Sequence, residues 1–322
     1  MWDDGHFAGV AEPSIELYEE VEVLLNAHPN WDFAGEVLSG SYYYQTWRCI
    51  GEEDAGAGIP GNGFGEDFYL TFRYHENGES QHFRIGAFEE YFHAQAEVAR
   101  PCVNLTNNNT APDPDGSFGG GTQYAITNGN NVFKHEVQVS EIMDYWILVA
   151  NDGVYVGSRI GTSDWGVYAG LFESLMEADP FPLVVSNIIS TSQHNTSTSD
   201  AHNANRGYWS RHPNVTVSNV RCFKVSFPQY QIWTRRSGQI GNIGDPFHNG
   251  RVLGSRLLVT VVGMSDGSSD INDFGNIRGL WNHLLYFNVP SGVAAGDTIN
   301  IDGDIYHYCG GSAHIWINRD AE

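Results

Sequence analysis

The sequence contains very little lysine, with only Lys134 and Lys224 among its 322 residues. Lysine belongs to the residue types that favour helices, so its scarcity argues against a mainly helical protein. The chain instead has 37 glycines and is 13% aromatic. Because aromatic residues favour strands and glycine favours turns, the composition predicts a β-rich fold with many turns.

Cysteine is also scarce. Cys49, Cys102, Cys222 and Cys309 stand far apart and form no C-x-x-C pair. Disulfide frameworks and cysteine-based zinc sites use closely spaced cysteines, so we expect buried free thiols. The spacing leaves open whether any two of the four form a disulfide.

Long apolar runs are missing. No run reaches the roughly 18 residues that a membrane-spanning helix needs. Residues 1–11, MWDDGHFAGVA, lack the basic start and the apolar core of a secretory signal. We therefore expect a soluble protein, made in the cytoplasm, with no membrane partner.

Positive charge is low overall and unevenly placed. The formal net charge is −23, which argues against nucleic-acid binding, since such binding depends on Lys and Arg replacing counterions. Residues 1–100 contain 19 acidic and 4 basic residues, whereas residues 181–265 contain 2 acidic and 8 basic ones. This polarity suits complementary faces between copies of the chain or between the chain and a neighbour. The alternative is that the arginines simply lie on solvated strands.

The first third of the chain predicts a small α+β unit over residues 1–102. Residues 14–27 have apolar side chains at helical spacing, with Ser14 available as N-cap. Strand-like runs follow at 36–50, 67–78 and 80–92, and the glycine-rich stretch 51–66 reads as a hairpin tip. We expect the helix to cover one face of an antiparallel sheet.

The rest of the chain predicts a β-sandwich-like body over residues 125–322. A linker rich in Asn, Gly, Pro and Asp, residues 103–124, separates it from the first unit. Asn151-Asp152-Gly153 marks a hairpin turn. The polar stretch 190–214 reads as a loop, and its length favours a functional role over a mere connection.

A search for chemistry yields no catalytic, cofactor-binding or metal-binding residue. Neither a nucleophile elbow, nor a phosphate loop, nor a zinc-protease motif is present. Aspartate clusters and loop histidines match no calcium or zinc signature and are typical of turns and solvated loops. The clusters considered are Asp113 and Asp115, then Asp266, Asp270 and Asp273, then Asp302 and Asp304, and the histidines are His194, His202 and His212. Acidic pairs such as Glu52-Glu53 and Glu89-Glu90 stand out no more than others.

Three segments together resemble a family of structural proteins from tailed-bacteriophage virions, about 300 residues long. The first is LLNAHPNWDFAGEVLSG (24–40), where a helix leads through Trp31 into a strand. The second and most specific is DYWILVANDGVYVGSRI followed by YAGLFESLMEADPFPLVVSN, and its matching positions are Asn151, Gly170, Pro180, Phe181 and Pro182. The third is GDTINIDGDIYHYCGGSAHIWINRD (296–320). The chain departs from the family in having Ser186-Asn187 where the pattern has Gly-Gly.

The resemblance implies a non-enzymatic virion protein without cofactors, present in several copies at the neck, collar or tail. Its partners would be itself and other virion proteins, such as portal, connector, tail-tube or fibre proteins, after assembly in the host cytoplasm. The residues agree with this role, because Pro180 and Pro182 fix an extended corner from which Phe181 projects, while Tyr168 and Phe172 pack beneath a sheet.

An alternative function is carbohydrate binding by a β-sandwich of a tail fibre or spike. Tyr208 and Trp209, within RGYWSR of the 190–214 stretch, would then stack on host glycans. A glycan-degrading enzyme is a third reading, with no carboxylate pair that singles itself out.

Overall fold

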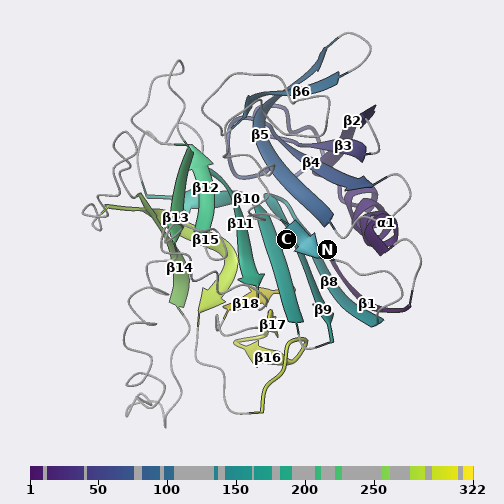
Figure 1. The fold of residues 1–322 in the computed structure, drawn as a ribbon. Coiled ribbons are helices and arrows are strands. Elements are labelled where there is room, and N and C mark those ends of the chain that lie inside the picture. Colours follow the sequence, from purple (N-terminus) through teal and green to yellow (C-terminus); the bar gives the residue numbers. More distant parts are fainter. Residues whose placement is uncertain are drawn as a thin grey trace, which may run out of the picture.

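The computed structural model describes residues 1–9, 13–39, 42–75, 82–94, 98–104, 134–136, 142–161, 163–175, 182–190, 207–211, 222–226, 255–261, 276–286, 292–310 and 315–321. Within these ranges the chain forms one helix, α1 (Pro13–Ala27), and strands in two antiparallel sheets (Figure 1). This confirms the predicted β-rich α+β class. Among the described residues, no helix has the length and apolarity needed to cross a membrane.

The smaller sheet has six strands. They are β2 (Trp31–Ser39), β3 (Tyr42–Cys49), β4 (Phe68–His75), β5 (His82–Ala94), β6 (Val98–Asn104) and β7 (Lys134–Glu136), with the order β2-β3-β4-β5-β6 and β7 beside β5. The predicted hairpin between β3 and β4 and the third strand are confirmed. The expectation of one continuous strand over 36–50 is wrong. Ser39 pairs with Tyr42, so this range holds the ends of two antiparallel strands, β2 and β3.

The larger sheet has twelve strands. They are β1 (Trp2–Ala8), β8 (Ile142–Ala150), β9 (Gly153–Ile160), β10 (Ser163–Ser174), β11 (Leu183–Ser190), β12 (Gly207–Arg211), β13 (Cys222–Ser226), β14 (Ser255–Val261), β15 (Asn276–Tyr286), β16 (Thr298–Ile301), β17 (Asp304–Tyr308) and β18 (Ile315–Asn318). Strand β10 is the branch point. It pairs with β9 and β11 along most of its length, and its last three residues pair with β15.

Strands β8 to β10 are buried on both faces. In β8, Tyr145, Ile147 and Val149 belong to one core cluster with the inner side chains of α1 and the smaller sheet. Trp146 and Leu148 point the opposite way, as the two-residue period of a strand requires, and are also buried. The ring of Trp146 lies 4.9 Å from the ring of His307 in β17. The larger sheet therefore curls back on itself, so that the C-terminal strands cover the face of β8 that α1 does not.

Helix α1 packs against one face of β8 and against the smaller sheet. Leu17, Tyr18, Val21 and Leu25 recur at helical spacing and are almost fully buried. The helix begins at Pro13, a residue type well tolerated as the first helical residue. The prediction of Ser14 as N-cap is therefore wrong, because Ser14 is the second residue of the helix. The helix ends where the His28 amide donates to the Leu25 carbonyl and Trp31 to His28.

A short repeat stabilises the β9–β10 hairpin. The sequences GVYVG (153–157) and GVYAG (166–170) pair in register, so that Tyr155 faces Tyr168 and each glycine faces a glycine. A Cβ atom on Gly157 would lie 2.3 Å from the hydroxyl of Tyr155, and one on Gly153 would lie 2.6 Å from that of Tyr168. Each tyrosine thus lies flat over a glycine pair, and both are fully buried.

The N-terminal strand joins the larger sheet. β1 pairs along its whole length with β8, from Trp2 opposite Leu148 to Ala8 opposite Ile142. These residues, which the predicted unit 1–102 includes, pair with a strand of the predicted body, and one core cluster extends across both sheets. Most of the expected linker, residues 105–124, lies outside the described residues.

Candidate functional site

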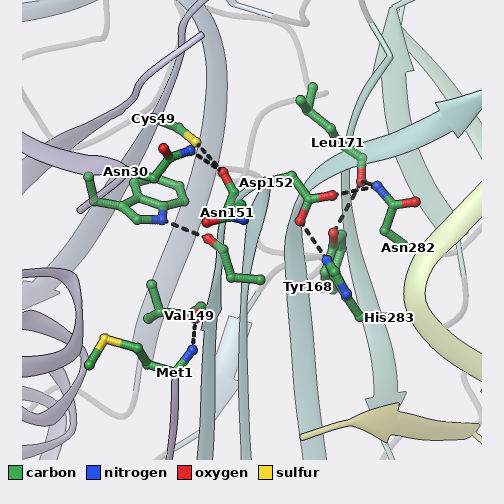
Figure 2. A network of polar contacts seen from close by, with 12 residues as sticks. Met1, Asn30, Cys49, Val149, Asn151, Asp152, Tyr168, Leu171, Asn282 and His283 are labelled. Carbon is green, nitrogen blue, oxygen red and sulfur yellow. Dashed lines mark hydrogen bonds and ion pairs between the residues drawn. The ribbon is translucent and has the colours of Figure 1, made fainter. Parts of the chain in front are cut away.

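The turn between β8 and β9 is the centre of a group of buried polar contacts. Asn151 and Asp152 form this two-residue turn between the paired residues Ala150 and Gly153, as predicted. Figure 2 shows side chains from the smaller sheet and from β15 converging on it. The β8–β9 turn, the smaller sheet, β10 and β15 meet at this point.

One side of the turn binds the smaller sheet. The Asn30 amide donates from Nδ2 to the Asn151 carbonyl over 2.7 Å, and the Cys49 thiol donates to the same oxygen over 3.0 Å. The Trp31 indole donates from Nε1 to the Ala150 carbonyl over 2.8 Å. Buried donors of these kinds are costly when unpaired, so these bonds fix how the smaller sheet sits on β8.

The other side of the turn binds β15. Both oxygens of the Asp152 carboxylate are used, with Asn282 donating to Oδ2 and His283 Nε2 meeting Oδ1, each over 2.5 Å (Figure 2). The Asp152 carbonyl accepts from the Leu171 amide over 2.7 Å, and the Leu171 carbonyl accepts from the hydroxyl of Tyr168 over 3.1 Å. The carboxylate thus ties the hairpin to the strand that begins the C-terminal layer.

His283 adopts an unusual backbone conformation to reach Asp152. Its φ is 57°, in the left-handed region that residues with a Cβ rarely occupy. Such a conformation costs about 1–2 kcal/mol and persists only where the surroundings impose it. Here the side chain of His283 and that of Asp152 are only 15% and 12% exposed, so the contact between them is largely shielded from water.

Two further ionisable side chains near the turn are kept neutral. Burial, followed by the charge of Asp152, raises the pKa of the Cys49 thiol well above its usual value. Burial and the N-terminal amine of Met1 lower the pKa of His28 to about 4, although Asp152 acts in the opposite direction. The Nδ1 atom of His28 accepts a hydrogen bond from the backbone amide of Asn30 over 3.2 Å. A protonated thiol is a poor nucleophile, so this arrangement is suited to holding segments together.

A second buried histidine lies where the C-terminal layer meets β1 and β8. The ring of His307 is 4.9 Å from that of Trp2 and 4.9 Å from that of Trp146. Its Nε2 is buried and has no hydrogen-bond partner within the part of the chain that the structure describes. Burial, and then the charge of Arg319, lower the pKa of His307 to about 3. Arg319 in turn lies 4.9 Å above the Trp2 ring.

The aspartate clusters of the sequence fall in different places. Asp302 and Gly303 form the turn between β16 and β17, with φ values of 56° and 109°, which explains this Asp-Gly pair by backbone geometry. Asp304 begins β17. The other aspartates, Asp113, Asp115, Asp266, Asp270 and Asp273, and the histidines His194, His202 and His212 lie outside the described residues. Among those described, no group of three His, Cys, Asp or Glu residues could hold a metal ion.

The remaining candidates are partly placed. Cys49 and Cys309 are buried free thiols, as expected, and Cys102 and Cys222 lie on β6 and β13.

Tyr208 and Trp209 lie on β12, which pairs with β11 and β13, so the prediction of a continuous loop over 190–214 is wrong for residues 207–211. The glycine-rich stretch 56–65 lies at the tip of the β3–β4 hairpin, as predicted, where the Glu52 carboxylate accepts from the Gly63 amide over 3.0 Å.

Sequence reasoning did not find the partners of the turn. Asn151-Asp152 was recognised for its turn propensity alone, and nothing in the run LWNHLLY indicates that Asn282 and His283 reach it. Neither the protein-family models nor the curated proteins include a match to this chain.

Proposed function

We propose that this chain is a non-enzymatic structural protein of a tailed-bacteriophage virion, present in several copies at the neck, collar or tail. Its partners are further copies of itself and neighbouring virion proteins. The proposal rests on the resemblance of residues 144–187 to such proteins, and on what the matching residues do in the fold.

The observation that carries the proposal is that three of the matching positions, Asn151, Gly170 and Pro182, lie where segments of the fold meet. The Asn151 carbonyl accepts hydrogen bonds from two residues of the smaller sheet. A Cβ atom on Gly170 would lie 2.4 Å from the Asp152 carbonyl oxygen, so the close approach of β10 to the turn requires glycine. The Pro182 carbonyl accepts from the Phe172 amide over 2.9 Å, directly before β11 begins at Leu183. Residues with these contacts hold the strands of the two sheets rigidly against one another.

The expected packing of the aromatic residues in this motif supports the same role. Tyr168 and Phe172 are 0% and 2% exposed, and Phe172 is paired with Trp281 of β15. Pro180 and Phe181, the expected corner and its projecting ring, lie outside the described ranges. A braced sheet buried on both faces is suited to bearing load in an assembly.

Purified phage particles from the source of this gene test the proposal. Mass spectrometry should find the chain in particles that have passed a density gradient, and a cryo-EM map should show it in a ring or sleeve at the neck or tail. Particles of full infectivity that lack the chain would overturn the proposal.

A glycan-binding experiment with the purified chain distinguishes the alternative function from the structural one. If the purified chain binds host surface glycans and Trp209→Ala abolishes this binding, a receptor-binding role replaces the structural one. Glycan binding unchanged by Trp209→Ala would count against that alternative.

A further inference from the structure

The C-terminal layer covers β8 and β9 through a buried contact. The side chains of Trp146 in β8 and Tyr155 in β9 point toward this layer and are 7% and 0% exposed. The ring of His307 in β17 faces Trp146, and Cys309, directly after β17, lies beside the Tyr155 hydroxyl. We call this contact, with these four residues and Trp2, the outer interface. It holds both a titratable base and a free thiol away from water.

His307 is buried in this interface as a neutral base. It is 1% exposed, and its ring lies 4.9 Å from the rings of both Trp2 and Trp146. Its buried Nε2 atom meets no hydrogen-bond partner among the described residues. Burial, and then the charge of Arg319, lower the pKa of His307 to about 3. The ring therefore takes up a proton readily only when the interface has opened and water reaches it.

The charged groups around His307 do not provide it with a counter-ion. Arg319 disfavours the protonated ring and is itself 3.5 Å from Asp4 of β1. Arg159 of β9 donates from Nε to Asp164 of β10 over 2.7 Å. Within the described part of the chain, no carboxylate pairs with His307. Further ionisable groups on the surrounding elements are Asp3, His6, Asp144, Tyr145, Tyr155, Asp297, Asp304, Tyr306, Tyr308, Cys309 and Asp320.

The contact between the smaller sheet and β8, which we call the inner interface, contains a second such pair. His28 is 6% exposed and Cys49 is 0% exposed. His28 differs from His307 because its Nδ1 atom accepts a hydrogen bond and the charge of Asp152 favours its protonated form, so its pKa is lowered only to about 4. Each interface thus has its own buried neutral histidine and its own buried thiol.

We propose that His307 makes the outer interface an acid-released contact, which opens locally and independently of the inner interface. Above about pH 6.5 the histidine is neutral in the closed and the open form, so pH has no effect through it. Between about pH 6.5 and pH 3 only the open form binds the proton, so the open fraction rises by up to about tenfold per pH unit. The opened form exposes the indole rings of Trp2 and Trp146. The inference does not depend on the proposed virion role.

Thiol labelling of the purified full-length chain measures the opening of each interface separately. A pyridyl disulfide reagent reacts with exposed thiols at neutral and mildly acidic pH, and peptide mass spectrometry distinguishes Cys309 from Cys49. Each rate is divided by the rate for an unstructured thiol peptide at the same pH, which cancels the pH dependence of the reagent. In the parent, the normalised rate for Cys309 should rise by up to about tenfold per pH unit between about pH 6 and pH 4.

Two substitutions show which histidine controls which thiol. His307→Phe keeps a ring between the two indoles and removes the titration, so the rise for Cys309 should disappear while labelling of Cys49 stays as in the parent. His28→Asn is the matched control, because asparagine keeps a hydrogen-bond acceptor and removes the titration from the inner interface. It should change the labelling of Cys309 less than about twofold, since the two histidines lie in separate interfaces. Circular dichroism should show that the sheets persist across this pH range.

Three results would overturn the proposal. The first is a normalised rate for Cys309 that does not change with pH. The second is a rise shared equally by Cys309 and Cys49 and accompanied by loss of the sheet signal, which would mean that the whole molecule unfolds at once. The third is a rise for Cys309 that persists in His307→Phe. The parent alone gives the first two results, so they decide the matter even if His307→Phe does not fold.

Discussion

At the scale of single residues, Asp152 connects the β8–β9 hairpin to two other strands. Its carboxylate meets Asn282 and His283 of β15, and its carbonyl accepts from Leu171 of β10. His283 holds a left-handed backbone conformation at this contact. The contact with this largely buried carboxylate offsets the cost of that conformation.

Replacing Asp152 by alanine should lower the free energy of unfolding by about 3 kcal/mol or more, because it leaves Asn282 and His283 without their buried partner. Asp144→Ala is the matched control, since Asp144 also pairs with a histidine, His6, but the two side chains are 47% and 51% exposed. That exposed pair should contribute less than about 1 kcal/mol. Urea unfolding of both variants measures the difference, and equal losses would contradict the role given to Asp152.

The residues of this site illustrate what sequence reasoning can reach. Turn propensity at Asn151-Asp152 depends on neighbouring residues and was predicted. The partners Asn282 and His283 depend on a strand that lies 130 residues further along the chain, and no local pattern encodes that approach. Likewise Asn30 and Cys49 gain their roles only once the smaller sheet has docked.

At the scale of elements, local periodicity predicted α1, β4, β5 and the β8–β9 hairpin. It failed where one run of β-forming residues, 36–50, belongs to two strands, and where a strand lacked apolar alternation, as in WDDGHFA of β1. The repeat of GVYVG and GVYAG is visible in the sequence and is typical of two paired strands. In the structure it explains why four glycines stand opposite one another beneath two tyrosines.

Gly157→Ala tests this glycine–tyrosine arrangement. The new methyl group would overlap the Tyr155 hydroxyl, which lies 2.3 Å from its position, so the free energy of unfolding should fall by about 1–3 kcal/mol. Gly56→Ala is the control, because a Cβ atom there meets nothing within 4 Å, and it should be neutral or slightly stabilising. Thermal melts compare the two, and a neutral Gly157→Ala would show that Tyr155 has room to move.

At the scale of the whole molecule, the two ends of the chain hold the layers closed. Trp2 of β1 lies between Arg319 and His307, and Arg319 also approaches Asp4 within 3.5 Å. His307 is buried in the neutral form between two indole rings. This packing makes the free energy of unfolding depend on pH.

The pKa of His307 is lowered to about 3, whereas an unfolded histidine titrates near 6.5. As the pH falls below about 6.5, the unfolded chain takes up a proton that the folded chain cannot accept until about pH 3. The free energy of unfolding should therefore fall by about 1.4 kcal/mol per pH unit from this residue alone.

His307→Phe removes this titration and keeps a ring between Trp2 and Trp146. Between about pH 6 and pH 4 the variant should lose stability less steeply than the parent, by up to about 1.4 kcal/mol per pH unit. The carboxylates are the same in both proteins, so their titration cancels in the difference. Parallel slopes in urea unfolding at several pH values would show that His307 is protonated in the folded state.

The pairing of β1 with β8 has a consequence for how the protein is made. The Met1 amine donates to the carbonyl of Val149, 148 positions further along the chain. At a synthesis rate of about 5–20 residues per second, β1 emerges from the ribosome roughly 7 to 30 seconds before its partner exists. During this wait it is an unpaired strand, and its aspartates and glycine keep it from joining the wrong edge. Strand β1 can therefore join the larger sheet only after β8 has been made.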